Sequence, residues 1–319
     1  MVRAHSSHPP ITLLAGGVGA AKFLRGLVRC VDEARVTVIV NTGDDEEFHG
    51  LHVSPDIDTI VYTLAGLANP VHGWGLRGET FKVLAALEPF YGKPWFALGD
   101  RDLATHLYRT QRLREGFRLS EITADIARRL GVRARVRPMS DDAVRTFIKL
   151  RGKPQALPFQ EYFVRGRARG AIESIELRGL ATAQPLPAML EAVAKSSAII
   201  LAPSNPFVSL GPILGLRGFR DALHAVKERV VAISPIVGGH TIKGPADKML
   251  RGLGHEVSAL GVARLYRDIV GAFVLDHADH RQVAAIEALG MRAIVTDTIM
   301  STPVRAARLA QVVMRALAV

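Results

Sequence analysis

Short runs of apolar, mostly β-branched residues recur along this chain, and segments of helical length separate them. Each run is almost continuously apolar, which is the pattern of strands that are buried on both faces. Such strands, alternating with helices, predict a parallel sheet covered by helices on both sides. We therefore expect an α/β fold, a Rossmann-like doubly wound parallel sheet. The expected strands are residues 11–15, 36–40, 198–202, 230–234, 269–275 and 293–296, and the expected helices are residues 20–31, 216–227, 281–289 and 302–319.

The middle of the chain departs from this pattern. Residues 79–130 have helical periodicity without intervening strands. Three later segments alternate like exposed antiparallel strands, namely residues 146–150, 159–164 and 172–177. We expect residues 79–177 to form a smaller helical and antiparallel subdomain. It would be inserted into a Rossmann-like nucleotide-binding domain made of residues 1–78 and 178–319.

Composition narrows the class of protein. The 319 residues, 48% of them hydrophobic and 22% charged, suit one or two globular domains. A single cysteine, Cys30, excludes an internal disulfide framework and indicates a reducing compartment. No apolar stretch approaches the roughly 20 residues of a membrane span, and glycines and Lys22 interrupt the one N-terminal run that resembles a signal peptide. We expect a cytoplasmic protein without a membrane partner.

The charge balance bears on the kind of ligand. The chain has 41 basic and 30 acidic residues, a formal net charge of +11, which suits anionic ligands or nucleic acid. The basic residues are mostly arginines spread along the chain, without a polybasic run. A nucleic-acid interface requires clustered charge, so we expect small anionic molecules as partners and no nucleic acid.

A glycine-rich turn follows the first expected strand and opens the first expected helix. Gly16, Gly17 and Gly19 allow close approach of the backbone, and the helix N-terminus offers unpaired N–H groups to an anion. Lys22 stands where the third glycine of a dinucleotide fingerprint belongs, and Asn41 follows the second strand in place of an acidic residue. These features argue against a nicotinamide cofactor. A tight turn without a ligand remains the alternative.

Carboxylates are concentrated after the second expected strand, in residues 44–47 and 56–58. This loop would lie beside the glycine turn, and several carboxylates next to a phosphate require a cation between them. Hard oxygen ligands of this kind suit Mg²⁺, and we select Asp45 and Asp58 as its ligands. Asp56 has an alternative role as a helix N-cap.

Other loops on the same edge contain polar or aromatic residues. Residues 202–212 and 234–245 follow strands and offer side-chain donors and acceptors, although turns with N-caps explain each loop alone. Trp74 and Arg77, among glycines, suit a wall for a planar heterocycle, with core packing of Trp74 as the alternative. Asp100, Asp102 and His106 are equally well read as helix residues.

Eight short segments together resemble the 2-phospho-L-lactate transferase family, whose members act in the biosynthesis of the deazaflavin coenzyme F-420. They occur in the family's order, from about residue 11 to residue 298, and as a set they are highly specific. The segments are residues 15–20, 41–45, 55–59, 98–102, 138–142, 159–161, 202–206 and 234–238.

The resemblance implies a reaction that the residues alone do not name. A phosphorylated three-carbon acid would pass from its guanosine diphosphate conjugate to the ribityl hydroxyl of the deazaflavin Fo, releasing GMP, with Mg²⁺ as cofactor. The acid is phospholactate, phosphoenolpyruvate or phosphoglycerate, and bacterial relatives are thought to use phosphoenolpyruvate.

The resemblance also assigns roles to residues. Asp45 and Asp58 would form the Mg²⁺ and acceptor region, with Asp45 orienting the hydroxyl or accepting its proton, and Trp74 and Arg77 would face Fo. The residues implied for the nucleotide are Gly16, Gly17, Gly19, Ser204, Asn205, Ser234, Gly238 and Lys243.

Two rival functions remain at this point. The first is a nucleotide-sugar-binding regulator of the related gluconeogenesis-factor family, which shares the glycine turn and the aspartate pair. The second is a nicotinamide-dependent oxidoreductase, which the incomplete fingerprint disfavours. We also expect a homodimer, because dimers are the commonest closed assembly.

Overall fold

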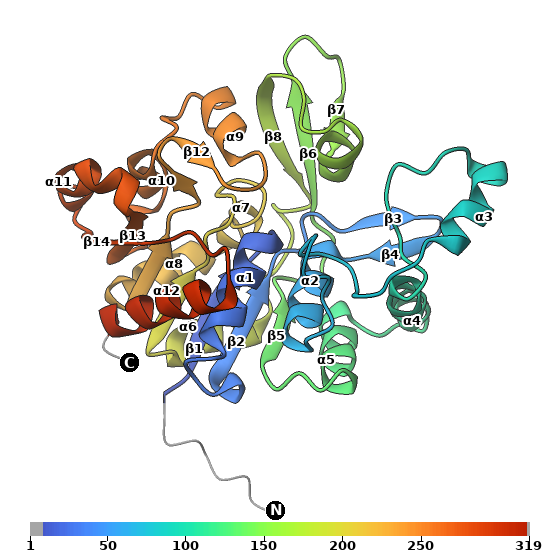
Figure 1. Cartoon of the computed structure of the whole chain (residues 1–319), viewed down its shortest axis with the longest axis horizontal. Helices are drawn as coiled ribbons and strands as arrows, with labels where there is room; N and C mark the ends of the chain where they lie inside the picture. The colour runs from blue at the N-terminus through green and yellow to red at the C-terminus, as the bar shows by residue number, and fades with distance from the viewer. Residues whose placement is uncertain (1–8, 318–319) are drawn as a thin grey trace, which may run out of the picture.

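A seven-stranded parallel sheet forms the centre of the computed structural model, which describes residues 9–317 (Figure 1). All neighbouring strands in it are parallel, as the near-continuous apolar runs predicted. The predicted α/β fold class is confirmed. In sheet order the strands are β14 (Arg292–Thr296), β13 (Ala272–Asp276), β10 (Val230–Ile233), β9 (Ala198–Leu201), β1 (Ile11–Ala15), β2 (Val36–Val40) and β5 (Arg135–Pro138).

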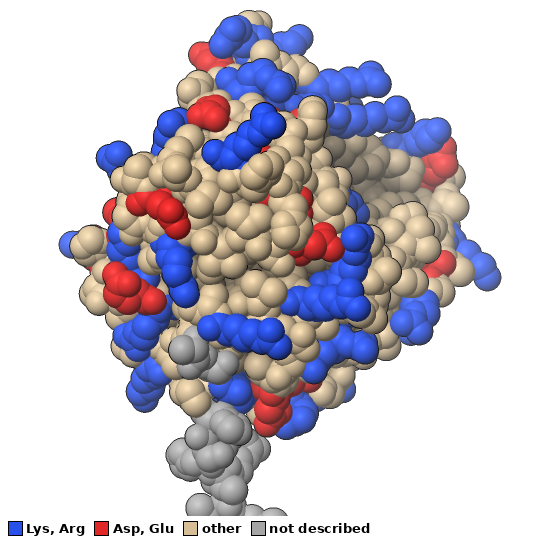
Figure 2. Space-filling model, turned by 60° about the vertical axis from the view of Figure 1, so that its left-hand side comes forward, with Lys and Arg blue, Asp and Glu red and all other residues tan. Residues whose placement is uncertain are grey.

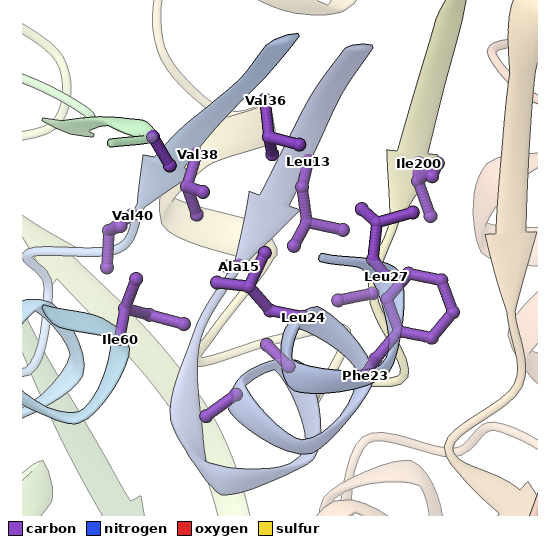
Figure 3. Close-up of a cluster of buried hydrophobic side chains, with 14 of the residues drawn as sticks. Leu13, Ala15, Phe23, Leu24, Leu27, Val36, Val38, Val40, Ile60 and Ile200 are labelled. Carbon is purple, nitrogen blue, oxygen red and sulfur yellow. The ribbon is translucent and has the colours of Figure 1, made fainter. Parts of the chain in front are cut away.

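Helices cover both faces of this sheet. Successive strand residues point to opposite faces, so Leu13 belongs to one hydrophobic cluster and Leu14 to the other. The first cluster, shown in part in Figure 3, packs Leu13 against Phe23 and Leu24 of α1. The helices on that face are α1 (Gly17–Leu27), α2 (Pro55–Leu64), α5 (Leu119–Arg129) and α12 (Pro303–Ala316). Those on the other face are α6 (Pro187–Lys195), α7 (Gly211–Leu214), α8 (Phe219–His224), α10 (Ala259–Tyr266) and α11 (Val283–Glu287).

The direction of winding reverses between β1 and β9. From β1 the chain builds outward through β2 to β5, and it then returns to place β9, β10, β13 and β14 on the other side. The loops after β1 and β9 meet there, because the Ser204 hydroxyl donates a 2.8 Å hydrogen bond to the Gly16 carbonyl. A Cβ at Gly19 would lie 2.4 Å from the Pro203 carbonyl oxygen, so only glycine fits. Ligands of doubly wound sheets bind at such a reversal.

Smaller elements lie beyond the carboxyl ends of the strands, where Figure 1 shows β6 and β8 standing above the sheet. The three-stranded antiparallel sheet has the order β7 (Ala156–Pro158), β6 (Arg145–Leu150) and β8 (Ile172–Arg178), and α9 (Ala246–Gly252) packs on it. Two antiparallel ribbons are β3 (Glu46–Phe48) with β4 (Leu51–Val53) and β11 (Ile236–Val237) with β12 (His240–Thr241). The remaining helical segments are α3 (Lys82–Tyr91), α4 (Asp102–Arg114), η1 (Glu33–Arg35), η2 (Glu161–Arg165), η3 (Lys227–Arg229) and η4 (His277–Gln282).

Two expectations about the middle of the chain need correction. The strand expected at 159–164 is the π-helical turn η2, which stacks the Phe159 and Phe163 rings with centroids 5.4 Å apart. Residues 79–177 also supply β5 to the central sheet, so they do not all stand outside it. The arginines of β5 concealed it, because an edge strand needs no continuous apolar run, and Pro138 is tolerated at such an edge.

The division into domains stays a prediction. Residues 1–8 of the expected domain and residues 318–319 of the expected last helix lie outside the described part of the chain. Among residues 9–317, no helix combines the length and the hydropathy that crossing a bilayer requires.

Candidate functional site

A cavity of about 590 Å³ lies where the loops after β1, β2, β9 and β10 meet. Most of the residues selected from the sequence line it, as the shared edge of the sheet predicted. Those that do are Gly16, Gly17, Gly19, Asp58, Trp74, Ser204, Asn205, Ser234 and Lys243. Three of the selected residues, Asp45, Arg77 and Gly238, are not among the residues that line this cavity.

A carboxylate of the protein occupies the N-terminal end of α1. Gly17 has a φ of +71°, and its N–H donates a 2.7 Å hydrogen bond to Oδ1 of Asp56. Asp56 is in the first turn of α2. Its carboxylate therefore caps the neighbouring helix α1, whereas the N-cap alternative placed it as the cap of its own helix. At least this N–H is therefore engaged before any ligand binds, and nucleotide binding by the glycine turn stays a prediction.

Asn41 connects the loops around Asp56. Its side-chain nitrogen donates to Oδ2 of Asp56 at 3.0 Å and to the Val208 carbonyl at 3.1 Å. Its side-chain oxygen accepts from the Gly43 N–H at 2.8 Å. This buried amide thus fixes the loops after β1, β2 and β9 relative to one another. Sequence reasoning noted Asn41 only as a missing acidic residue, and that substitution was the signal for its role.

Three buried carboxylates gather beside this connection. Burial raises the pKa of Asp44 well above its ordinary value, and the charges of Asp56 and Asp45 add to that effect. Burial likewise raises the pKa of Asp56 to about 6, although hydrogen bonds from Asn41 and Gly17 oppose the shift. Among residues 9–317, one oxygen of Asp44 and one of Asp45 are buried without a hydrogen-bond partner. Unpaired carboxylate oxygens that repel one another fit a divalent cation.

Asp45 faces a smaller adjoining cavity of about 70 Å³. Its Oδ2 accepts a 2.8 Å hydrogen bond from the Ser54 hydroxyl and lies 3.0 Å from Nε2 of His52. Its Oδ1 has no hydrogen-bond partner in the described part of the chain. Asp44 lines both cavities and therefore joins Asp45 to the larger one. Sequence reasoning did not select Asp44, although it lies in the same acidic run as Asp45.

Asp58 is held differently from the other carboxylates. Both of its oxygens accept hydrogen bonds from the guanidinium of Arg109, a side chain that is fully buried. Asp58, Asp102 and His106 have donor atoms close enough to share a metal ion. The guanidinium already supplies a positive charge at Asp58, however, and so balances part of the negative charge that a cation would neutralise there. The prediction that Asp45 and Asp58 hold Mg²⁺ stays untested.

Two basic side chains, Lys22 and Lys243, line the cavity. Burial and the nearby charge of Lys22 lower the pKa of Lys243, whose Nζ donates a 2.6 Å hydrogen bond to the His72 carbonyl. Neither lysine has a carboxylate within 4.0 Å among residues 9–317. Two adjacent ammonium groups without counter-ions suit an anionic ligand. Lys22 was noted in the sequence only as a departure from the dinucleotide fingerprint.

Aromatic side chains form another part of the cavity wall. Trp74 stacks on His72 with centroids 5.3 Å apart and lines the cavity, while its contact with a planar heterocycle stays a prediction. Arg77 instead donates to the Gly66 carbonyl at 3.3 Å, away from the cavity lining. Sequence reasoning missed further rings on the wall, which belong to Trp95, Phe96, Phe159 and Phe163.

Several of the polar loop residues serve the loops themselves. The Asn205 side chain accepts from the Phe207 N–H at 2.9 Å, and the Ser234 hydroxyl accepts from the Ile236 N–H at 3.1 Å. The Gly238 N–H donates to Asp279 at 3.0 Å. These contacts match the alternative in which the loops are turns, and nucleotide contacts by the same residues stay a prediction.

Comparison with known proteins agrees with this architecture. The family described as "2-phospho-L-lactate transferase CofD" matches residues 11–312. The chain is 43% identical over 296 residues to a phosphoenolpyruvate transferase of Kitasatospora aureofaciens, covering 91% of this chain and 92% of the relative. It is 42% identical to a phosphoenolpyruvate transferase of Thermobifida fusca, covering 94% and 95% of the two chains. It is 36% identical to a 2-phospho-L-lactate transferase of Methanosarcina mazei, covering 95% and 99%.

Solved structures support the fold alone. Two crystal structures of protein BH3568 from Bacillus halodurans, a member of the UPF0052 family, match with TM-scores of 0.63 and 0.65. They are 18% and 16% identical to this chain, and the matches cover 97% of it and 100% of the other chains.

Proposed function

The chain belongs to the 2-phospho-L-lactate transferase CofD family, and on that premise we propose that it transfers a phosphorylated three-carbon acid to the deazaflavin Fo. The donor joins the phosphate of the acid to the phosphate of GMP and so contains one diphosphate. The ribityl hydroxyl of Fo forms a bond to the phosphorus that carries the acid and loses its proton, the bond between the two phosphates breaks, and GMP is released. The product belongs to the biosynthesis of coenzyme F-420. The observation that carries this proposal is the family match over residues 11–312, which includes every loop of the cavity.

We infer that the acid is phosphoenolpyruvate. The relatives that are 41–43% identical to the chain are named phosphoenolpyruvate transferases, whereas the Methanosarcina relative named for phospholactate is 36% identical. The rival role as a nucleotide-sugar-binding regulator gains no support from these names. Phospholactate and phosphoglycerate remain the alternatives to be compared in the assay.

The cavity suits two substrates that meet end to end. Its volume of about 590 Å³ is within the usual range of small-molecule sites. Lys22 and Lys243 would attract the diphosphate, while Trp74, Trp95 and Phe96 would contact the planar ring of Fo. Transfer of a phosphoryl group depends mainly on such positioning and on neutralisation of charge.

Mg²⁺ completes the proposed site. We propose Asp45 and Asp58 as its ligands, with Asp44 beside Asp45. Asp44 and Asp45 fit such an ion because both are buried and, among residues 9–317, one oxygen of each has no hydrogen-bond partner. When bound, Mg²⁺ would neutralise negative charge on the diphosphate. Asp45 is the carboxylate that we propose to orient the acceptor hydroxyl or take its proton, since its Oδ1 accepts no hydrogen bond from any of residues 9–317.

The test is release of GMP from the donor. Purified protein is mixed with Fo, Mg²⁺ and phosphoenolpyruvate joined to GMP through a diphosphate, and released GMP is measured by chromatography. We expect GMP to form only when Fo and Mg²⁺ are both present. Asp45→Asn should lower the rate at least about a hundredfold while the protein stays folded. Absence of Fo-dependent GMP from any of the three donor conjugates would refute the proposed function.

A further inference from the structure

Asp56 occupies a position that an anionic ligand would be expected to take. Its carboxylate accepts hydrogen bonds from the Gly17 N–H at 2.7 Å and from the Asn41 side chain at 3.0 Å. The Gly17 N–H belongs to the end of α1 that carries partial positive charge. Asp56 lines the cavity although only 6% of its surface is exposed. The protein thus provides its own anion at this helix end.

Other carboxylates increase the negative charge around Asp56. Asp44 and Asp45 influence each other and Asp56 electrostatically, and all three are buried. Among residues 9–317, none of these three carboxylates is paired with a lysine or an arginine, and the partner within 4.0 Å of Asp45 is His52. Lys22 and Lys243 line the same cavity, but the three buried carboxylates remain a source of negative charge, in a region of low dielectric, for a diphosphate that approaches the glycine turn.

We propose that Asp56 is a positioning residue that makes nucleotide binding at this cavity conditional on a divalent cation. The inference rests on the proposed function, because it takes the nucleoside diphosphate part of the donor as the ligand. Without a cation, the charge of Asp56 repels the diphosphate from the end of α1. With a cation held by the neighbouring carboxylates, that repulsion is compensated, and Asp56 continues to hold the glycine turn in place through Gly17.

A purely structural latch is the competing explanation for Asp56. The same two hydrogen bonds would fix the glycine turn whether or not a cation is present. The two explanations differ in what happens when the charge is removed and an acceptor oxygen is kept, as in Asp56→Asn. If Asp56 is only a latch, Asp56→Asn weakens it and lowers nucleotide affinity both with and without cation. If the charge of Asp56 repels the nucleotide, Asp56→Asn raises nucleotide affinity in the absence of cation.

The experiment is calorimetric titration of the full chain with GDP, once with Mg²⁺ and once with a chelator. We expect the wild-type protein to bind GDP at least about tenfold more weakly without Mg²⁺. Asp56→Asn should bind GDP more tightly than the wild type in the chelator and should lose most of the Mg²⁺ effect. Asp56→Glu, which restores the charge, should restore the Mg²⁺ effect. Asp221→Asn, the same change on an exposed side chain of α8, should behave like the wild type.

A second measurement uses only the wild-type protein, so it does not depend on whether a variant folds. Guanosine, which has no phosphate charge, should bind equally with Mg²⁺ and with chelator, whereas GDP should not. The inference is overturned if wild-type GDP affinity is the same in both conditions, or if Asp56→Asn keeps the full Mg²⁺ effect. Either result leaves the transferase proposal standing. Conversely, loss of the Mg²⁺ effect in Asp56→Asn supports the inference even if the GMP assay with Fo fails.

Discussion

At the scale of single residues, the pairing of Asp58 with Arg109 decides how one of the candidate metal ligands behaves. Burial raises the pKa of Asp58, and the adjacent guanidinium opposes that rise. The Arg109 side chain is fully buried, so its charge is balanced by Asp58 and not by solvent. The sequence does not predict this pair, because Asp58 and Arg109 are 51 positions apart and belong to different helices.

This pairing predicts a large difference between two arginine substitutions. Arg109→Ala should lower the free energy of unfolding by roughly 3–5 kcal/mol, because it leaves a buried carboxylate without its partner. Arg118→Ala removes an exposed pair with Glu121 and should cost no more than about 1 kcal/mol. Denaturant unfolding of both variants measures the difference. Similar losses in the two variants would show that Asp58 does not depend on Arg109.

At the scale of elements, the strands followed from the sequence more reliably than the loops. The ranges of β1 and β2 agree with prediction because strands buried on both faces leave an unbroken apolar run. β5 was missed because it is an edge strand with arginines, and η2 was read as a strand because its aromatic residues fit either structure. The loops at the cavity were located correctly, since parallel strands end at one edge. Their internal hydrogen bonds, such as Gly17 to Asp56, depend on tertiary contacts that the sequence does not encode locally.

The end of β13 anchors one of these loops. Asp276 accepts hydrogen bonds from the Thr298 N–H at 2.8 Å and the Thr298 hydroxyl at 3.0 Å, and Thr298 lines the cavity. Burial alone would raise the pKa of Asp276, but these bonds and one from the Ala278 N–H lower it overall. A lowered pKa means that the stabilisation is present above the ordinary value of 3.8 and is lost as the pH falls through the folded value.

Asp276→Asn should therefore be destabilising in a pH-dependent way. We expect a loss of about 1–3 kcal/mol near neutral pH, since hydrogen bonds to a charged acceptor are replaced by weaker ones. The difference from the wild type should shrink as the pH is lowered below about 4. Urea unfolding of both proteins across this range measures it. A difference that is constant or that grows toward acid pH would contradict the role given to Asp276.

At the scale of the whole molecule, the excess of basic over acidic residues bears on how the protein attracts ligands. On the face shown in Figure 2, lysine and arginine side chains are scattered and interspersed with acidic and uncharged residues. The net charge of +11 nevertheless attracts anions over a distance of about a Debye length. The absence of nucleic acid among the partners, the cytoplasmic location and the homodimer stay predictions.

This charge predicts faster capture of the donor at low ionic strength. The association rate constant for GDP in Mg²⁺ should fall severalfold between about 50 mM and about 300 mM salt, while the rate constant for uncharged guanosine stays constant. Stopped-flow binding experiments measure both. Equal salt dependence for the two ligands would show that the net charge does not steer the nucleotide.

The candidate site was predicted in part from the sequence. The position of the cavity followed from the positions of the loops, most of the residues selected from the sequence line it, and the resemblance supplied the proposed reaction. Asp44, Asn41 and Lys22 were not selected, because an acid in a run of acids, an amide and a lysine after a glycine turn each have many ordinary roles. Only their placement around one cavity distinguishes them.

The measurement that tests the central claim most directly is the mass of the deazaflavin product. Wild-type protein is incubated with Fo, Mg²⁺ and an equal mixture of three donors, in which phosphoenolpyruvate, phospholactate or phosphoglycerate is joined to GMP through a diphosphate. We predict that Fo gains the mass of one phosphoenolpyruvyl group, in an amount equal to the GMP released. Fo that is recovered unchanged while the donors remain intact would contradict the account.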